Sequence, residues 1–455
     1  MPTKQARHQI FDYRVALDYL LCCREFDEGN LTIARASPLA GPVACQTTPI
    51  LFQHVRVFDG LQVIPSTDVL IRDGRIENIG QDPKDPSAQI VDGTGKTLLP
   101  GLIDSHVHVH RAESLQQALI FGVTTAFDMA MPAYRISELK NSEISSMADF
   151  WSARELATAP RGHGTEYGLI IPTTTSLKEA QAWVDDRIAE GSAYIKIVYG
   201  DASEYGSRRI WPTLSKQSMT AIIAAAHKRG RLAVVHIGSQ WQAKDAIEAG
   251  ADGLAHLFIG ASCDRNFGAL VAAHQAFVIP TLTVLHSICG TTASRSELIS
   301  DPYLRPFLRR DNVANLKETF PWGSRLVSCA SAGGAIKQLK AARVPILAGT
   351  DAPNPGTTYG ASLHEELVLL VEAGLTPTEA LIAATSVPAL AFHVSDRGRI
   401  VRGLRADLVL VNGNPTEDIL ATRNIVTVYK GGIEDDRDAC RGMAKISSAS
   451  RRLGP

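Results

Sequence analysis

The sequence of 455 residues lacks the marks of several common classes of protein. It carries almost no net charge, with 46 basic against 47 acidic residues, so it lacks the basic excess that nucleic-acid binding or docking on an anionic membrane usually requires. No apolar run reaches the ~20 residues that a membrane-spanning helix needs. We therefore expect a small-molecule substrate as partner, and neither nucleic acid nor a membrane.

Cysteine is scarce, and its spacing shows no pairing pattern. The count is odd and no CxxC motif occurs, which argues against a disulfide framework and against a thiolate zinc site. The seven residues are Cys22, Cys23, Cys45, Cys263, Cys289, Cys329 and Cys440. A reducing compartment fits this pattern best, and we predict a cytoplasmic protein.

Residues 1–48 do not have the usual form of a secretory signal. The apolar stretch 13–23 is interrupted by Asp18 and is followed at once by the charged residues Arg24 and Glu25. A signal peptide would have a continuous apolar region there. We predict that this segment is an amphipathic or poorly ordered extension.

Short β-rich runs lie in two regions, residues 49–100 and 397–434. Asp73-Gly74 separates two of these runs and is typical of a tight hairpin turn. Because both regions have the same character, we predict one small β-sandwich domain built from both ends of the chain. Residues 435–455 are expected to form a polar, frayed tail.

Residues 101–396 alternate apolar runs with helical patterns. The eight apolar runs are GLIDSHVHV, VTTAFDMA, TEYGLIIP, YIKIVYG, LAVVHIG, GLAHLF, FVIPTLTV and PILAGTDAP. Helices are expected to begin at the capping residues Ser176, Ser215 and Thr376. This alternation predicts an α/β fold, a (β/α)8 TIM barrel. A doubly wound open sheet is the alternative, but no GxGxxG phosphate loop follows any strand. Homo-oligomers are common for this architecture, although the sequence marks no interface.

Ionisable residues stand at the ends of several apolar runs, where a barrel places its active site. They are His106, His108, Lys196, His236, His256 and Asp351. Burying this set without a common partner would be costly, and a pair of divalent metal ions supplies that partner. Residues two apart on a strand point to the same side, so His106 and His108 can bind one ion together. The alternative is a pair of solvated loop histidines.

Lys196 lies within a strand of apolar residues, where lysine is rare. Its charge must be paired or removed there. A salt bridge inside the barrel and snorkelling to the rim are two structural explanations. The third is a reaction of the amine with carbon dioxide, which gives a carbamate able to bridge two metal ions.

The remaining candidates each have an ordinary explanation when taken alone. His236 and His256 could be core or rim histidines, and Asp351, with prolines close behind it, could be a turn aspartate. Their occurrence on successive runs favours metal binding. Loops carry specificity in a barrel, so three further residues are candidate substrate contacts, although plain loop roles explain them equally well. These are His163, Tyr199 and His286.

These motifs resemble those of the amidohydrolase superfamily, in its prolidase-like and imidazolonepropionase-like branch of metal-dependent hydrolases. The resemblance covers residues 49–430 and rests on GLIDSHVHV, YIKIVYG, VVHIG, GLAHLF and GTDA, then on GLTPTEALIAATSVPA and GRIVRGLRADLVLV. It implies the barrel and the β-sandwich. In binuclear relatives, the residues that match His106 and His108 bind the buried ion, and those that match His236 and His256 bind the outer one. The match to Lys196 bridges both ions as an N6-carboxylated lysine.

The resemblance also implies the reaction, that of a binuclear amidohydrolase with zinc as the expected metal. A hydroxide bridging the two ions would cleave an amide-like C–N bond other than a classical peptide bond. Asp351 would bind one ion, take the proton and pass it to the leaving nitrogen. Non-classical peptides and cyclic or aryl amides are the expected substrates.

Other functions stay open. A lactonase or esterase could use the same two ions. A mononuclear deaminase is disfavoured, because such relatives place a glutamate soon after the residue matching His236 and none occurs here before Glu248. Dipeptidase activity is also disfavoured, because Ile237-Gly238-Ser239 follows His236 where peptidase-like relatives often place a tyrosine. A non-catalytic scaffold should lack some of the six ligands, and none is missing.

Overall fold

The structure is a computed structural model that describes residues 48–80, 83–132, 139, 146–165, 171–203, 210–320 and 327–437. The predicted extension, apart from Thr48, and the predicted tail beyond Arg437 lie outside these residues. Among the helices that are described, none is both long enough and apolar enough to span a membrane.

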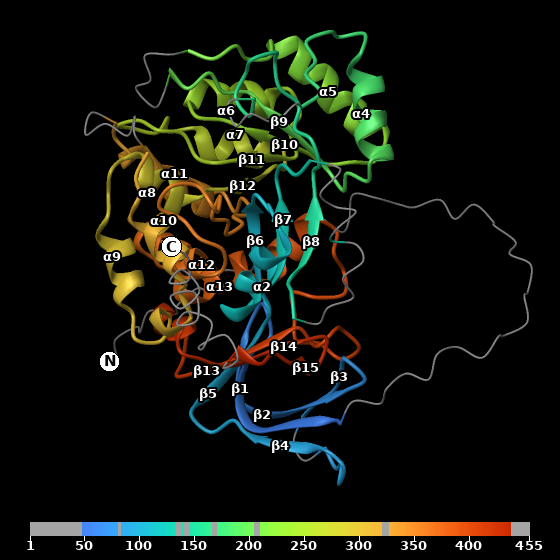
Figure 1. Cartoon of the computed structure of the whole chain (residues 1–455), viewed down its shortest axis with the longest axis vertical. Helices are drawn as coiled ribbons and strands as arrows, with labels where there is room; N and C mark the ends of the chain where they lie inside the picture. Colours follow the sequence, from blue (N-terminus) through green and yellow to red (C-terminus); the bar gives the residue numbers. More distant parts are fainter. Residues whose placement is uncertain are drawn as a thin grey trace, which may run out of the picture. The chain divides into compact units, whose positions relative to one another are not determined.

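Strands from the two β-rich regions form one sheet, drawn in blue and red in Figure 1. Its strands are β1 (Ile50–Phe58), β2 (Val63–Arg72), β3 (Arg75–Gly80), β4 (Gln89–Asp92), β5 (Lys96–Pro100), β13 (Leu408–Asn412), β14 (Ile425–Lys430) and β15 (Ile433–Glu434). They follow the order β15-β14-β13-β5-β1-β2-β3, with β4 beside β1. The antiparallel pairing of β13 with β5 joins the C-terminal strands to the N-terminal ones. The described residues of the two chain ends thus form a single sheet. The two facing sheets of a sandwich remain a prediction.

Apolar side chains on one face of this sheet make its core. Phe52, Val57, Leu98, Leu408 and Tyr429 belong to one buried cluster. Successive side chains of a strand point to opposite faces, so a period of two brings residues of neighbouring strands together on the buried face.

The predicted hairpin between β2 and β3 is confirmed. Arg72 pairs with Arg75 across the turn, and the two central residues, Asp73 and Gly74, have φ of 48° and 74°. Positive φ at both positions is the geometry of a type I′ turn, which aspartate and glycine adopt at low cost.

The middle of the chain has a TIM-barrel-like α/β arrangement of parallel strands and helices (Figure 1). One sheet holds β6 (Leu102–Val107), β7 (Val123–Asp128) and β8 (Asp149–Ser152), and the other holds β9 (Ile195–Val198), β10 (Ala233–His236), β11 (Gly253–Ala255) and β12 (Phe277–Ile279). The helices of the described residues are α2 (Ala112–Ile120), α4 (Ala180–Ala189), α5 (Lys216–Lys228), α6 (Gln240–Glu248), α7 (Phe267–Ala273), α8 (Leu282–Ile288), α9 (Ala293–Ser300), α10 (Arg310–Lys317), α11 (Ala330–Ala341), α12 (Ala361–Glu372), α13 (Pro377–Ala383) and α14 (Ser386–Ala391), with a short 3-10 helix η2 (Arg305–Phe307). A second 3-10 helix, η3 (Ile419–Arg423), lies between β13 and β14.

Isolated bridges connect the two parallel sheets. Ala157 pairs with Ile197, Val278 with Ile346, and Val107 with Ala352. The segment 346–352 therefore lies between β12 and β6, where the eighth strand of a barrel belongs. This segment pairs with each neighbouring strand through only one isolated bridge. The closed eight-stranded barrel that the sequence predicts is therefore formed in part.

The third strand is not the one predicted. β8 pairs with β7, and the bridge at Ala157 places its continuation beside β9. The predicted run, residues 165–172, lies largely outside the described residues, and its described ends form no strand. The four residues of β8 read DFWS, too short and too polar to stand out as an apolar run.

The predicted helix starts are confirmed at two of three positions. The Ser215 side chain accepts a hydrogen bond from the amide of Ser218, and Thr376 forms a capping box with Glu379. At the third position, α4 begins at Ala180 rather than directly after Ser176, because residues 177–179 form a turn first.

The structure contains a disulfide between Cys289 and Cys329, contrary to the expectation of reduced thiols. The bond joins the end of α8 to the start of α11, and it closes a loop of 40 residues. Spacing could not reveal it, because the fold alone brings the two residues together. Disulfides are typical of oxidising compartments, so the cytoplasmic location stays a prediction that this bond weighs against.

A group of buried charges connects β8 to the terminal sheet. The carboxylate of Asp149 accepts hydrogen bonds from Arg397 at 2.5 Å, Arg405 at 2.8 Å and Lys430 at 2.8 Å. The side chains of Arg397 and Lys430 are 5% and 2% exposed. Burial raises the pKa of Asp149, but Lys430 and Arg397 outweigh it and hold the pKa below its ordinary value.

Replacing Asp149 with asparagine is therefore expected to lower the free energy of unfolding by about 3 kcal/mol. This value is at the lower end of the destabilisation expected for breaking a buried ion pair, because the Asp149 side chain is itself 33% exposed. The loss should shrink as pH falls below the unfolded aspartate pKa, where the wild-type carboxylate also becomes protonated. Urea unfolding measures the effect, with Asp186→Asn at an exposed position of α4 as the control. A loss no larger than that of the control would contradict this role.

Candidate active site

Three candidate ligands meet where the segment 346–352 runs beside β6. His106, His256 and Asp351 each offer a ligand atom, and these atoms all lie within 4.8 Å of one another. The Oδ1 atom of Asp351 is 3.2 Å from Nε2 of His106 and 3.0 Å from Nε2 of His108. His106, in β6, and His108, just after β6, thus face the same carboxylate, as the period of two along an extended chain predicts.

The remaining histidines extend this group across the other sheet. The ring of His256 lies 4.7 Å from that of His106 and 4.6 Å from that of His236. His106, His236 and His256 are buried, whereas 25% of the His108 side chain is exposed. His108 therefore lies on the solvent side of the cluster.

Glycine allows the close approach of the eighth segment. A Cβ atom on Gly349 would lie 2.6 Å from Ile279 and 3.0 Å from the backbone nitrogen of His106. No larger residue fits between β12 and β6 without a shift. The amide of Asp351 then donates to the carbonyl of His106 at 2.7 Å, which fixes the aspartate opposite β6.

Two candidate ligands have left-handed backbone conformations. The φ of His256 is 74° and that of Asp351 is 59°. Such conformations cost about 1–3 kcal/mol each for residues other than glycine, and they persist where the surrounding structure holds them. In both cases the left-handed residue comes at the end of an apolar run. Its backbone conformation turns the chain there, so that the side chain faces the other candidate ligands.

Lys196 is buried in β9, with 2% of its surface exposed. Among the described residues its Nζ atom has no hydrogen-bond partner. Burial lowers the pKa of its amine to about 7, against the opposing charges of Asp351 and Asp128. Much of the amine is therefore neutral and nucleophilic at neutral pH.

Burial also keeps the histidines neutral. It lowers the pKa of His106 to about 3 and the pKa values of His236 and His256 well below the ordinary value. For Asp351 burial acts in the opposite direction, but the nearby imidazoles outweigh it and hold the pKa well below its ordinary range. The cluster thus presents neutral imidazoles and an ionised carboxylate, which are the forms that bind metal ions.

Residues 97–434 match the amidohydrolase family over most of the chain. The chain belongs to this family. An imidazolonepropionase from Cereibacter sphaeroides is 26% identical over 390 residues, covering 77% of this chain and 90% of that protein. Two solved structures share the fold: a Xaa-Pro dipeptidase with bound methionine (TM-score 0.67, 22% identity, 85% of this chain and 99% of that one) and molinate hydrolase (TM-score 0.68, 20% identity, 90% and 99%).

The donor atoms of the cluster fit the divalent ions on which this family generally depends. Both ring nitrogens of His106 and Oδ1 of Asp351 are buried and make no hydrogen bond within the described part of the chain. Unpartnered buried polar atoms are rare and costly, so they point to a missing ligand. Imidazole nitrogens with carboxylate oxygens are a donor set that suits zinc.

Thr281 fixes the tautomer of His256, a role that no sequence signal indicated. The Thr281 hydroxyl donates its proton to the carbonyl of Pro280 at 2.8 Å and lies 2.7 Å from Nδ1 of His256. The hydroxyl has only one proton, so Nδ1 of His256 must be the donor. Nε2 then carries the free electron pair that a metal ion requires.

Replacing Thr281 with valine is expected to weaken zinc binding about 10- to 100-fold, because it removes the acceptor that orients His256. Valine has nearly the same shape as threonine, so the backbone at φ 51° keeps a β-branched residue. Competition with a chromogenic chelator measures the affinity. Thr220→Val, on an exposed position of α5, is the matched control. Wild-type affinity in Thr281→Val would show that His256 is held by other means.

Asp104 holds the backbone next to two candidate ligands, His106 and Asp351. The sequence analysis did not single it out, although it lies in the same apolar run as His106. Its carboxylate accepts hydrogen bonds from the amide and the hydroxyl of Thr350, at 3.0 and 2.7 Å, and from the amide of His106 at 3.2 Å. Burial raises its pKa to about 7. A buried acid two residues before a candidate ligand was the available signal.

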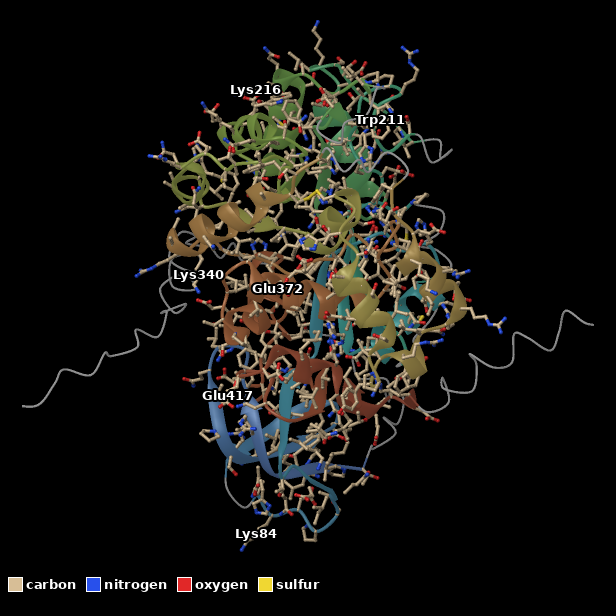
Figure 2. All side chains as sticks on the ribbon, turned by 90° about the vertical axis from the view of Figure 1, so that its left-hand side faces the viewer. Lys84, Trp211, Lys216, Lys340, Glu372 and Glu417 are labelled. Carbon is tan, nitrogen blue, oxygen red and sulfur yellow. A yellow bond between two sulfur atoms is a disulfide. The ribbon has the colours of Figure 1, made fainter. Side chains whose placement is uncertain are left out.

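The three predicted substrate contacts lie in different surroundings. The ring of His163 lies 4.8 Å from that of His236 and stacks on Trp211, which is labelled in Figure 2. The Tyr199 hydroxyl instead lies 3.1 Å from the carboxylate of Asp245 on α6. His286 lies on α8. Of the three, only His163 is brought into ring contact with the cluster among the described residues.

Proposed function

We propose that this amidohydrolase cleaves an amide-like C–N bond of a small molecule with the help of two divalent metal ions, most suitably zinc. The observation that carries the proposal is the convergence of buried donor atoms that, within the described residues, make no hydrogen bond. The Oδ1 atom of Asp351 lies within 3.2 Å of His106 and His108, but within the described residues it makes no hydrogen bond to either. Six mostly buried ionisable groups would otherwise be a stability cost without use.

The proposed ligands divide into two groups around Lys196. His106, His108 and Asp351 would hold one ion, because Asp351 lies within 3.2 Å of both histidines. His236 and His256 would hold the other. When bound, the ions would polarise a substrate carbonyl and lower the pKa of water toward 7.

Lys196 would connect the two groups as a carbamate. Its neutral amine can attack carbon dioxide, forming an N–C bond and releasing one proton, and the buried amine becomes an anion with two oxygen donors. This change removes the desolvation penalty of an unpaired ammonium group. It also explains why no protein group accepts from Nζ in the described residues.

Asp351 would move the proton. Its Oδ1 atom has no hydrogen-bond donor of good geometry among the described residues and faces His106 and His108. We propose that this carboxylate takes a proton from the attacking water and then donates it to the leaving nitrogen. His163 would contact the substrate beside His236.

Metal analysis combined with a substrate screen tests this function. Two ions per chain and turnover of N-acyl amino acids, aryl amides or cyclic amides are expected. Matched esters and lactones are assayed beside each amide, so preference for the esters would identify an esterase instead. One ion per chain with ammonia release would identify a deaminase. A purified protein that neither contains nor responds to zinc, manganese, iron or cobalt would overturn the proposal.

A further inference from the structure

A cavity of about 480 Å³ is lined in part by residues that follow two of the proposed metal ligands, His108 and Asp351, along the chain. Its walls come from three segments: the loop after β6, the loop after Asp351, and the start of α10. The lining includes His110, Arg111, Arg309, Asn312, Pro353 and Tyr359. None of these residues belongs to the proposed metal ligands.

Hydrogen bonds tie this cavity to the proposed ligands. The Tyr359 hydroxyl donates to the carbonyl of His108 at 2.6 Å. The amide of His108 donates to the carbonyl of Ala352 at 2.8 Å, and Pro353 is the next residue. On the other wall, the side-chain amide of Asn315 donates to the carbonyl of Pro353 at 3.0 Å. The cavity wall is therefore continuous with the backbone that carries His108 and Asp351.

Two guanidinium groups line the cavity from opposite segments, and neither is fully paired. Asp311 lies 3.8 Å from Nη2 of Arg111 and 3.7 Å from Nε of Arg309, which is too long for a hydrogen bond. Glu113, the other acid near Arg111, is 3.9 Å away. The buried Nε of Arg309 makes no hydrogen bond within the described residues. Donor groups are thus available for a ligand.

We propose that this cavity binds a carboxylate carried by the amide substrate, with Arg111 and Arg309 as its donors. The inference rests on the proposed function and defines its substrate class: amides of which one end is a carboxylic acid, such as N-acyl amino acids. The two arginines and Asp311 together carry one net positive charge, which matches a single carboxylate better than a doubly charged phosphate. Guanidinium groups favour planar carboxylates because they can donate two parallel hydrogen bonds.

The test compares acids with neutral amides of the same shape. A series of N-acylglycines, from acetyl to benzoyl and decanoyl, is titrated calorimetrically into the zinc-loaded, full-length protein beside the matching N-acylglycinamides. At least one acid is expected to bind about ten-fold or more tightly than its amide. Arg111→Gln and Arg309→Gln should each reduce this preference about ten-fold.

Arg310→Gln is the matched control, because Arg310 is the exposed neighbour of Arg309 on the same helix and does not line the cavity. It should keep the full preference. Equal affinity for acids and amides, no binding of any acid, or the same loss in Arg310→Gln would each overturn the inference. Hydrolysis is followed separately: a preference for acids that both arginine variants lose, without cleavage of any substrate, would contradict the proposed function but support the carboxylate site.

Discussion

Replacing Asp351 with asparagine is expected to lower kcat about 10²–10⁴-fold, the usual contribution of a positioned acid–base group. Asparagine keeps the size of aspartate and an oxygen that can still face His106 and His108. It cannot accept a proton and return it to a leaving nitrogen. The wild-type carboxylate is ionised and has an oxygen free to accept a proton, because the neighbouring imidazoles hold its pKa well below its ordinary range despite burial.

The measurement needs a control for metal loss, because Asp351 is also a proposed ligand. Steady-state kinetics on the best amide of the screen should therefore be accompanied by metal analysis and circular dichroism of the same preparation. Asp245→Asn, which changes an aspartate on α6 outside the cluster, should keep near-normal turnover. Near-normal kcat in Asp351→Asn with full metal content would remove Asp351 from the mechanism.

The sequence could predict much of the cluster, because strand ends are visible in it. Parallel strands of a barrel all end at one face, so residues that follow separate apolar runs must approach one another. His106, His236 and His256 illustrate this: each lies within one residue of the end of a strand, and their rings lie within 4.7 Å of a neighbouring ring. No knowledge of side-chain geometry was needed for that step.

Side-chain direction beyond the strand ends was not predictable in the same way. Tyr199 directly follows β9, but its hydroxyl lies beside Asp245 and its ring contacts Trp241. These partners come from the next helix, whose packing the local sequence does not specify. The tautomer of His256 was unpredictable for the same reason. It is set by Thr281, which lies in the turn after the neighbouring strand β12.

Features that form between distant segments of the chain could not be predicted from the sequence either. Cys289 and Cys329 meet only because α8 ends where α11 begins, and an odd cysteine count hides one pair among unpaired residues. β8 was missed for a different reason. Asp149, its first residue, pairs with Arg397 and with Lys430 of β14, so the strand begins with a charge instead of an apolar residue.

Replacing Lys196 with methionine is expected to lower kcat by on the order of 10³-fold. It should also reduce the bound metal from two ions per chain to one or none. Methionine fills nearly the same volume and carries no charge, so the buried strand should fold at least as well. It cannot form a carbamate, and the two groups of ligands then lose their shared anion. Lys216→Met, at the surface position labelled in Figure 2, is the control that should keep both ions.

The carbamate also predicts a pH dependence for reconstitution of the wild-type protein. Only the neutral amine attacks carbon dioxide, and burial lowers the pKa of Lys196 to about 7. At equal dissolved carbon dioxide, the metal-free, decarboxylated protein should therefore regain activity with zinc about ten-fold faster at pH 8 than at pH 6. Carbon-13-labelled bicarbonate should give a carbamate signal that Lys196→Met lacks. Full activity and two ions in Lys196→Met, or recovery that needs no carbon dioxide, would show that this lysine acts as an ordinary amine.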